Sequence, residues 1–246
     1  MMRKIYSTVS FLMIAGSVFA GTVDESQTKY VKQYEKQKNV PNPAKQLVNI
    51  DAEPNLKTGF KPLFNGKDLT GWTSKGGQCT FEVKDGAIMG TCVKKTPSTW
   101  LCTDKEYGDF IFTCEVKWLV DGNSGVQFRS KARGKVGKET VYGPQYELEG
   151  FARGRNWTGG IYGQSCGGWY YPLWLEAHQK ARAAVTHEWN RVTILAKGNV
   201  VKTWINGVPA THWLNDTYLK GFIGLQVHQG SKGQILWRNV KIKELK

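Results

Sequence analysis

From Gly59 onward, apolar and polar residues alternate in short runs separated by turns rich in glycine, asparagine and aspartate. A period of two places successive side chains on opposite faces of a β-strand, so each run predicts a strand with one buried face. The predicted strands are Thr80–Val83, Ala87–Gly90, Phe110–Leu119, Gly125–Arg129, Gln145–Leu148, Val192–Lys197, Val200–Ile205, Gly221–Val227 and Ile235–Glu244. Many short strands without a long amphipathic helix favour one all-β domain, built as a two-sheet antiparallel sandwich.

Turn residues indicate how neighbouring strands are joined. Asp85-Gly86 between two strand-like runs is a strong signal for a two-residue hairpin, and Asn206-Gly207 supplies a second turn. Pro172–Ala184 is the one plausible helix in this part of the chain, and its helical spacing is weak. Helices are therefore expected to be a minor part of the domain.

The chain start has the pattern of a secretory signal peptide at residues 1–20. Arg3 and Lys4 precede the mostly apolar run Ile5–Phe19, and Val18-Phe19-Ala20 has the small-residue pattern that a signal peptidase accepts. This run is too short for a membrane span, and no later segment approaches the roughly 20 apolar residues that a spanning helix needs. The protein is therefore predicted to be secreted or periplasmic, with no membrane span.

The segment between the signal and the domain has a different composition. Residues 21–58 are polar, contain three prolines and carry few large apolar side chains. Such a segment buries too little apolar surface to fold alone, which predicts a leader arm or linker with at most a short helix around Lys29–Gln37. The expected domain is residues 59–246.

The chain is strongly basic. Removing Arg3 and Lys4 with the signal lowers the formal net charge from +14 to +12. The lysines are spread along the chain without an arginine-rich block or a nucleic-acid-binding motif, so the charge indicates a solvated basic surface and no nucleic-acid partner. The oligomeric state is left open by the sequence.

An odd number of cysteines, five, occurs in a chain predicted to leave the reducing cytosol. If the Asp85-Gly86 hairpin keeps its register, Cys79 lies opposite Cys92 at a non-hydrogen-bonded pair, which predicts a disulfide. Cys102 and Cys114 are candidates for a second bridge, and Cys166 is left unpaired. No Cys or His pair has the spacing of a structural zinc site, so no cofactor is predicted, although a divalent metal is left open.

The stretch YGPQYELEG, residues 142–150, points to a functional face. Gln145, Glu147 and Glu149 occupy every second position, so a strand would present all three on one side and Tyr146 and Leu148 on the other. Three further strands repeat this arrangement and present Gln127 and Arg129, Gln226 and His228, and Trp204. Amides, charged groups and aromatic rings suit sugars, which offer hydroxyls around an apolar ring face, whereas the alternative is an ordinary solvated sheet face.

An ordered series of short motifs runs from Gly59 to the end of the chain. The motifs are GFKPLFNGKDLTGW (59–72), YGDF (107–110), GNSGVQFRS (122–130), QYELE (145–149), TGGIYG (158–163), TWINGVPA (203–210), GFIGLQVH (221–228) and WRNVKIKEL (237–245). In this series the chain resembles the 3-keto-disaccharide hydrolase family, formerly a domain of unknown function. The resemblance implies the jelly-roll sandwich of concanavalin-like lectins and glucanases. The chain departs from the family pattern at Glu149, where Asp is common, and at GQSCGGW, where an acidic residue and two arginines are common.

The resemblance implies cleavage of glycosides, in particular disaccharides, whose sugar is oxidised at its third carbon. The ketone acidifies the proton on the second carbon, so that removal of this proton expels the glycosidic oxygen, and water then adds. Such a site needs a base, for which Glu147 is the first candidate and His228 the second, and a positive charge at the enolate oxygen, for which Arg129 is the candidate. The predicted substrate-binding residues are Gln127, Gln145, Glu149, Trp157, Tyr162, Trp204 and Gln226.

Two other functions remain compatible with these residues. Glu147 and Glu149 could be the carboxylate pair of a conventional glycosidase, because residues two apart on a strand allow either stereochemical course. A carbohydrate-binding module of the lectin type would use the same amides and aromatic rings without turnover. An enzyme of either kind needs the carboxylate of Glu147 for turnover, whereas a carbohydrate-binding module needs only the shape of this side chain.

Overall fold

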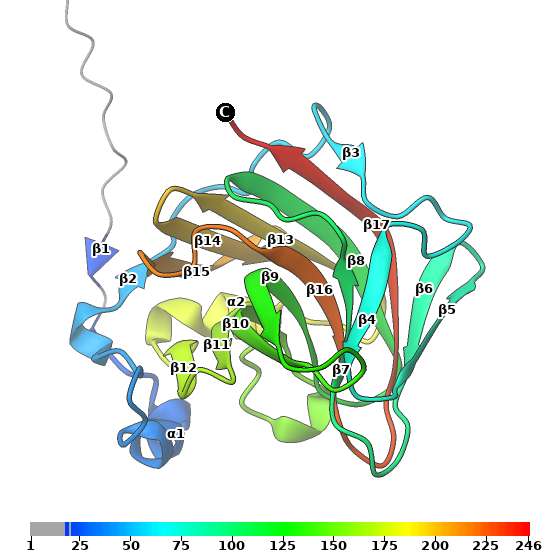
Figure 1. Cartoon of the computed structure of the whole chain (residues 1–246). Coiled ribbons are helices and arrows are strands. Elements are labelled where there is room, and N and C mark those ends of the chain that lie inside the picture. The colour runs from blue at the N-terminus through cyan, green and yellow to red at the C-terminus, as the bar shows by residue number, and fades with distance from the viewer. Residues whose placement is uncertain (1–17, 20) are drawn as a thin grey trace, which may run out of the picture.

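The computed structural model describes residues 18–19 and 21–246 and shows two β-sheets packed face to face (Figure 1). The predicted signal peptide lies outside the described residues except for Val18 and Phe19. Every strand pairing is antiparallel. The predicted all-β, two-sheet sandwich is therefore confirmed.

The first sheet has ten strands among the described residues, in the order β1-β2-β15-β14-β13-β8-β17-β6-β5, with β3 also paired to β17. Its strands are β1 (Val18–Phe19), β2 (Leu47–Val48), β3 (Lys61–Pro62), β5 (Thr80–Lys84), β6 (Ala87–Thr91), β8 (Phe110–Val120), β13 (Asn190–Lys197), β14 (Val200–Ile205), β15 (Val208–Leu214) and β17 (Gln234–Glu244). This sheet forms the back of the sandwich and contains no strand of the site described below.

The second sheet has seven strands in the order β12-β11-β10-β9-β16-β7-β4. Its strands are β4 (Trp72–Gly76), β7 (Thr99–Thr103), β9 (Ser124–Arg133), β10 (Thr140–Leu148), β11 (Ile161–Gln164), β12 (Gly168–Tyr171) and β16 (Phe222–Val227). Its inward face carries apolar side chains such as Val126, Phe128 and Leu225, which are buried against the first sheet. Its other face is free to carry polar side chains.

Helices are short and peripheral among the described residues. The α-helices are α1 (Thr28–Tyr34) and α2 (Gln179–Ala183), and the 3₁₀ turns are η1 (Glu25–Gln27), η2 (Pro43–Lys45), η3 (Phe151–Arg153) and η4 (Glu176–His178). The segment predicted as one helix, Pro172–Ala184, becomes helical only from Glu176, because Leu173–Leu175 are extended and buried in the core. Burial of three apolar residues in the core outweighs their weak helical spacing.

The predicted strands are present, and two hairpins follow their turn signals. Asp85-Gly86 and Asn206-Gly207 each connect adjacent strands and have positive φ at both turn residues, as a tight hairpin requires. The structure adds strands that the alternation did not reveal, among them β4, β7, β11, β12 and β15. Of these, β7 and β11 matter most, because they contribute to the site.

The predicted disulfides are not formed, and all five cysteines are free. The hairpin keeps the expected register up to Thr80 opposite Thr91. Beyond that pair the ladder ends, since the amide of Cys79 donates to Thr99 Oγ1 (2.9 Å) and that of Cys92 donates to the Gly233 carbonyl (2.9 Å). The two thiols still interact, because burial and then the neighbouring Cys79 raise the pKa of Cys92. Cys102 and Cys114 lie in different sheets, on β7 and β8, which explains why they do not pair.

The N-terminal segment is packed against the domain. Asp24 forms a buried ion pair with Arg182, and Gln27 accepts a hydrogen bond from the Trp157 indole (2.8 Å). Further along, Asn49 donates to the Thr203 carbonyl (3.0 Å). In Figure 1 the segment runs in blue beside β12, so the polar arm predicted from the sequence is a wall of the folded protein.

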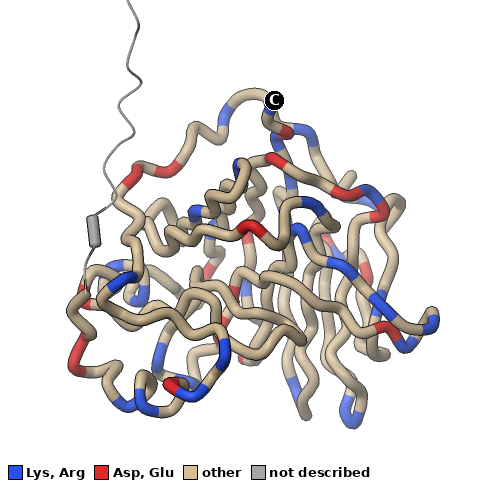
Figure 2. The backbone as a smooth tube through the Cα atoms, turned by 60° about the vertical axis from the view of Figure 1, so that its left-hand side comes forward, with Lys and Arg blue, Asp and Glu red and all other residues tan. Residues whose placement is uncertain are grey.

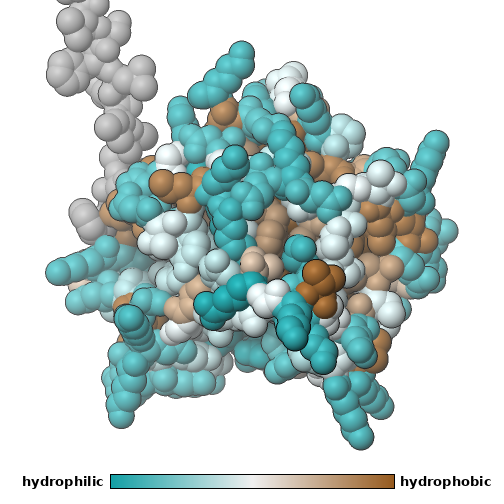
Figure 3. Space-filling view, viewed as in Figure 1, coloured by the Kyte–Doolittle hydropathy of each residue, from teal (hydrophilic) through white to brown (hydrophobic). Residues whose placement is uncertain are grey.

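The surface is hydrophilic and its charges are distributed. Lysines, arginines and acidic residues alternate over the tube in Figure 2, without one continuous basic block. The face in Figure 3 is largely hydrophilic, with hydrophobic residues scattered over it. Among the described residues, no helix has the length and apolar character needed to cross a bilayer.

Candidate functional site

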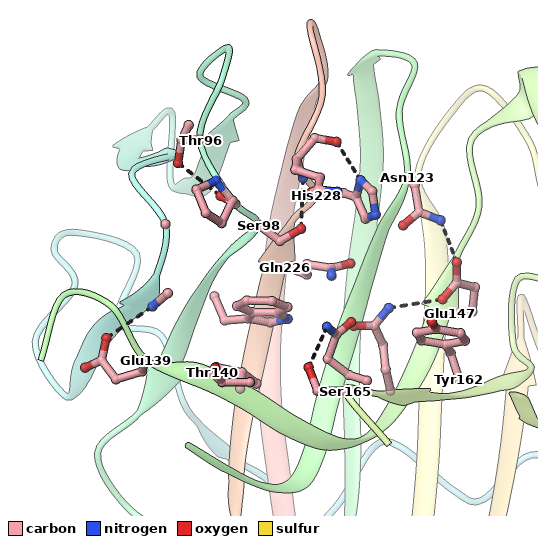
Figure 4. A pocket seen from close by; sticks show the side chains of 18 of the residues that line it. Thr96, Ser98, Asn123, Glu139, Thr140, Glu147, Tyr162, Ser165, Gln226 and His228 are labelled. Atoms are coloured by element: carbon pink, nitrogen blue, oxygen red, sulfur yellow. Dashed lines mark hydrogen bonds between the residues drawn. The ribbon is translucent and has the colours of Figure 1, made fainter. Parts of the chain in front are cut away.

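A cleft of about 850 Å³ lies over the second sheet. Strands β7, β9, β10 and β16 form its floor, and the loops around residues 95–98 and 137–140 form one end. The other end is formed by β11, β12 and the N-terminal segment. Figure 4 shows the side chains of Glu147, Gln226 and His228 facing this hollow, from β10, β16 and the residue after β16.

Strand register brings the residues of the floor into one row. Glu147 of β10 pairs with Gly125 of β9, which pairs on its other side with Gln226 of β16. Gln226 in turn pairs with Trp100 of β7. Since directly paired residues point to the same face of a sheet, these positions form a continuous strip across four strands, with Gly125 between Glu147 and Gln226.

Glu147 lies at one end of this strip and is almost fully buried, with 4 % of its surface exposed. Both carboxylate oxygens accept hydrogen bonds from amide side chains. Asn123 Nδ2 donates to Oε1 (2.5 Å) and Gln145 Nε2 donates to Oε2 (3.0 Å). These two bonds hold the carboxylate in one orientation toward the cleft.

The environment of Glu147 makes it a weaker acid. Burial raises its pKa to about 7, and repulsion by Glu149 adds to this rise. The hydrogen bond from Asn123, the charge of Arg155 and the hydrogen bond from Gln145 act in the opposite direction. A carboxylate with this pKa is deprotonated in about half of the molecules near neutral pH and is a stronger base than an exposed glutamate.

A relay of amides continues from Glu147 into the sheet. The Gln145 oxygen accepts from Gln127 Nε2 (2.9 Å), and the Gln127 oxygen accepts from Ser130 Oγ (2.7 Å). Gln127 is fully buried behind Gln145, so it orients the relay and does not line the cleft. Gln127 therefore does not contact a sugar as predicted, and instead holds the Gln145 amide in place.

The glycine at position 125 leaves room for this relay. A Cβ placed there would lie 2.4 Å from Gln145 Cδ and 2.5 Å from its Nε2. Gly125→Ala should therefore push the Gln145 amide away from Glu147, which removes a hydrogen bond to the carboxylate and raises its pKa further. We expect turnover at pH 7 to fall by about tenfold, measured as kcat/KM over a pH series.

Gln145→Ala is the matched variant for this prediction, because it removes the displaced amide without adding a methyl group. Both variants should move the acidic limb of the profile to higher pH. A Gly125→Ala protein with the pH profile of the wild type would show that Gln145 does not act on Glu147.

Arg155 lies next to Glu147 and is fixed from several sides. Its Nε donates to Glu149 Oε1 (2.5 Å), and its guanidinium lies over the rings of Trp157 (4.5 Å) and Trp169 (4.9 Å). Burial lowers the pKa of Arg155, but attraction to Glu149 outweighs this and leaves it above its usual value. A permanent positive charge thus lines the cleft beside the carboxylate.

Glu149 does not line the cleft, although the alternation placed it beside Glu147. One of its oxygens binds Arg155, and the other accepts from the amide of Trp157 (2.9 Å). The strand ends at Leu148, so the period of two no longer applies at the next residue. Glu149 therefore holds Arg155 in place, and the prediction that Glu149 contacts the substrate is wrong.

His228 lines the cleft directly after the end of β16, the strand on the other side of β9 from Glu147. Its Nδ1 donates to the Gln229 carbonyl (2.6 Å), which leaves Nε2 with a lone pair. Burial lowers the pKa of His228, a hydrogen bond with the Gln229 carbonyl opposes this, and the charge of Arg153 lowers it further. A neutral imidazole that can accept a hydrogen bond is expected at pH 7.

Two buried polar atoms in the floor have no hydrogen-bond partner among the described residues. They are Trp100 Nε1, a donor, and Gln226 Oε1, an acceptor, and both residues line the cleft. Buried polar groups are nearly always paired, so this donor and acceptor are available to polar groups of a bound molecule. Tyr162, which also lines the cleft, adds a phenol whose pKa is raised by burial and by the charge of Glu147.

Arg129, predicted to stabilise an enolate, does not reach the cleft. Its guanidinium is fully buried and donates to the Gly108 and Gly198 carbonyls (2.8 Å each) and to Asp109 (2.9 Å). Strand β9 carries one extra residue between Gln127 and Ser130 relative to both neighbouring strands, and Arg129 has φ +48°. This β-bulge breaks the alternation and turns the side chain away.

The two tryptophans predicted to stack on a sugar are also elsewhere. Trp204 lies on β14 in the first sheet, and its indole donates to the Asp51 carbonyl (2.9 Å). Trp157 is fully buried under Arg155 and the N-terminal segment. The aromatic ring on the cleft floor is Trp100, which follows Ser98-Thr99 in a strand that was not recognised.

Other residues of the site were missed for a common reason. Arg155 follows the end of β10 in a loop, and Tyr34 and Gln37 come from the N-terminal segment, where no alternation exists to reveal them. Asn123 immediately precedes β9, and its side chain reaches Glu147. Within the part of the chain that the structure describes, no group of three or more His, Cys, Asp or Glu side chains is arranged to hold a metal ion.

Comparisons with known proteins agree with this architecture. Residues 59–243 match the family model described as 3-keto-alpha-glucoside-1,2-lyase-like domain. No curated protein matches the chain. Two crystal structures of proteins from Parabacteroides distasonis ATCC 8503, each described as a "putative glycosyl hydrolase", are similar to it. One is 24% identical, covering 80% of this chain and 100% of that chain with a TM-score of 0.56.

The second of these structures is 22% identical, covering 87% of this chain and 96% of that chain with a TM-score of 0.51. A protein of unknown function with a galectin-like fold from Bacillus subtilis is 13% identical, covering 79% of this chain and 98% of that chain with a TM-score of 0.57. At these identities the likeness shows the fold, a galectin-like sandwich, and the chemistry has to be argued from the cleft.

Proposed function

Because the chain belongs to the 3-keto-alpha-glucoside-1,2-lyase-like domain family, we propose that it is an exported enzyme that cleaves 3-keto-glycosides, including 3-keto-disaccharides, by elimination followed by hydration. The observation that carries the proposal is Glu147, a buried carboxylate with a pKa of about 7 on the floor of a polar cleft. Export rests on the signal-like sequence of residues 1–20.

The chemistry follows from the position of the ketone. A carbonyl at the third carbon acidifies the hydrogen on the second carbon, and the glycosidic oxygen is attached one carbon further along. Removal of this proton gives an enolate, which re-forms the ketone and a double bond between the first and second carbons as the glycosidic bond breaks. The leaving oxygen takes up the proton that the base removed and departs as an alcohol. Water then adds across the double bond and releases the free keto sugar.

The cleft offers a group for each need of this reaction. Glu147 takes the proton from the second carbon, because it is the buried base whose pKa lies nearest to neutrality. Arg155 stabilises the enolate oxygen, a role in which a preorganised charge in a water-poor site is most effective. Trp100 and Gln226 provide the unpaired donor and acceptor for sugar hydroxyls, and His228 accepts a further hydrogen bond.

The pH dependence should report Glu147 directly. Only the deprotonated carboxylate can act as a base, so kcat/KM should fall tenfold per pH unit below about 7 and level off above it. An unperturbed glutamate would give the same limb near pH 4 to 5. A rate that stays constant from pH 8 down to pH 5 would contradict the assignment of Glu147 as the base.

A conventional two-carboxylate glycosidase fits the cleft less well. Glu149 is held by Arg155 and the Trp157 amide, so it is not free to act on a glycosidic bond. The other carboxylate that lines the cleft, Glu139, accepts from the amides of Gly76 (3.3 Å) and Gly137 (2.9 Å) at the opposite end (Figure 4). Neither is placed as a partner to Glu147 across one bond.

The test is to incubate the purified mature protein with a 3-keto-disaccharide and, separately, with its unoxidised parent, and to follow sugar release. The proposal predicts cleavage of the keto substrate alone. Cleavage of the parent alone would identify a conventional glycosidase. Binding of either sugar without release of product would identify a carbohydrate-binding module.

A further inference from the structure

The N-terminal segment contributes two side chains to the cleft. Tyr34 and Gln37 line it together with Arg155 and Trp169, although residues 21–58 precede the matched domain, which begins at residue 59. The Tyr34 hydroxyl accepts a hydrogen bond from Arg155, and its ring lies 5.7 Å from that of Trp157. The cleft is therefore closed at this end by residues from outside the family domain.

The GQSCGGW loop, residues 163–169, is shaped to receive this segment. Gln37 Oε1 accepts from the Trp169 amide (2.9 Å), and Asn39 Nδ2 donates to the Cys166 carbonyl (2.6 Å). A Cβ on Gly168 would lie 2.1 Å from Gln37 Oε1, so only glycine permits this contact. The loop in which the sequence departs from the family pattern is thus the loop that binds the N-terminal segment.

The segment is fixed firmly enough to act as a wall. The Asp24–Arg182 ion pair is buried, and Gln46 bridges the Pro172 carbonyl (2.8 Å) and the Trp174 indole (2.6 Å). Breaking a buried ion pair is costly, so the segment has a strong preference for this position. Its contacts with the cleft are therefore part of the folded state.

We propose that the N-terminal segment is a specificity element: Tyr34 and Gln37, seated by Gly168, form the end wall of the cleft and bind the oxidised sugar. Glu147 lies near this end of the floor, whereas the rest of the cleft extends across β9, β16 and β7 toward β4. The sugar that loses its proton to Glu147 consequently lies against the wall, and the leaving group occupies the longer part.

The wall has the chemistry to recognise hydroxyl groups. The oxygen of the Gln37 amide accepts from Trp169, which leaves its NH₂ group as the donor available to a sugar in the cleft, and Tyr34 presents a phenol held by Arg155. These groups match the hydroxyls on the side of the sugar ring next to the ketone. The assignment of the oxidised sugar to this end rests on the proposed function.

The experiment measures binding of free 3-keto-glucose by calorimetry and of two 3-keto-glucosides with different leaving groups by kinetics. Gln37→Ala should weaken binding of the free keto sugar by about three- to tenfold and raise KM for both glucosides by the same factor, with kcat nearly unchanged. Gln37 is partly exposed, so this change is compatible with folding.

Gly168→Ala should displace the N-terminal segment from the loop and so cause the same loss of affinity. This displacement should be seen as faster amide hydrogen exchange in Thr28–Tyr34. Gly66→Ala is the control, because Gly66 also has positive φ (+78°) but a Cβ there meets nothing within 4 Å. The inference would be overturned if Gln37→Ala bound the keto sugar as tightly as the wild type. It would also be overturned if Gly168→Ala did so despite faster exchange in Thr28–Tyr34. A wild-type protein that binds keto sugar without cleaving it would overturn the proposed function alone, and one that binds no sugar would overturn both.

Discussion

Glu147→Gln should reduce kcat by about a thousandfold while sugar affinity changes by no more than about threefold. The substitution keeps the size and the planar shape of the side chain and removes the base. Glu147 is held at both oxygens by Asn123 and Gln145, so the variant side chain keeps the same position in the floor. Loss of turnover with retained sugar binding identifies an enzyme. A lectin has no turnover to lose, and its sugar affinity would also be unchanged by this substitution.

The amide relay can adapt to the new side chain. The NH₂ group of Gln at position 147 would face Gln145 Nε2, so the amides of Gln145 and Gln127 must reverse their orientation. The Ser130 hydroxyl at the end of the relay can either donate or accept, and it therefore absorbs the reversal. The variant should consequently fold with a melting temperature close to that of the wild type.

His228→Gln is the control for the rival base. His228 lines the same cleft and is neutral at pH 7, so it could in principle accept the proton through Nε2. If Glu147 is the base, His228→Gln should keep at least about a tenth of the activity, because it loses only one hydrogen bond. Full activity in Glu147→Gln together with inactivity in His228→Gln would reverse the assignment.

Arg155→Met should lower kcat by about a hundredfold or more, because it removes the positive charge proposed to stabilise the enolate. It should also shift the acidic limb of the pH profile upward, since the Arg155 charge now lowers the pKa of Glu147. Glu149 would be left buried without its partner, so the free energy of unfolding should fall by about 3 kcal/mol. Chemical denaturation and kcat measured on the same sample check both effects.

The double variant Arg155→Met with Glu149→Gln separates stability from catalysis. It removes both charges of the buried pair, so much of the lost stability should return. Activity should remain as low as in the single variant, because the charge near the substrate is still missing. Recovery of activity along with stability would show that Arg155 acts only as a structural partner of Glu149.

Alternation of residue types predicted the architecture and the face of β10 and β16 that lines the cleft. It placed Gln145 and Glu147 on one face of β10 and Gln226 with His228 on one face of β16, and the structure brings Glu147, Gln226 and His228 to one cleft. These assignments succeed because the strands are regular between paired neighbours. Periodicity is informative wherever the ladder continues without interruption.

The errors occur where regularity ends. Arg129 lies within a β-bulge, and Glu149 follows the last residue of its strand, so neither keeps the face that alternation assigned. Trp204 has the right pattern but belongs to the other sheet, which periodicity within one strand cannot reveal. Arg155 and Tyr34 are brought together by contacts across 121 residues, and no local pattern marks such a pair.

The most direct measurement of the proton-abstraction mechanism is cleavage of a 3-keto-glucoside in D₂O, with the released keto sugar analysed by NMR or mass spectrometry. The account predicts one deuterium at the second carbon of every product molecule, incorporated during cleavage and faster than the product exchanges on its own. Release of keto sugar that retains its original hydrogen at the second carbon, together with an unchanged rate for a substrate deuterated at that carbon, would contradict proton abstraction by Glu147.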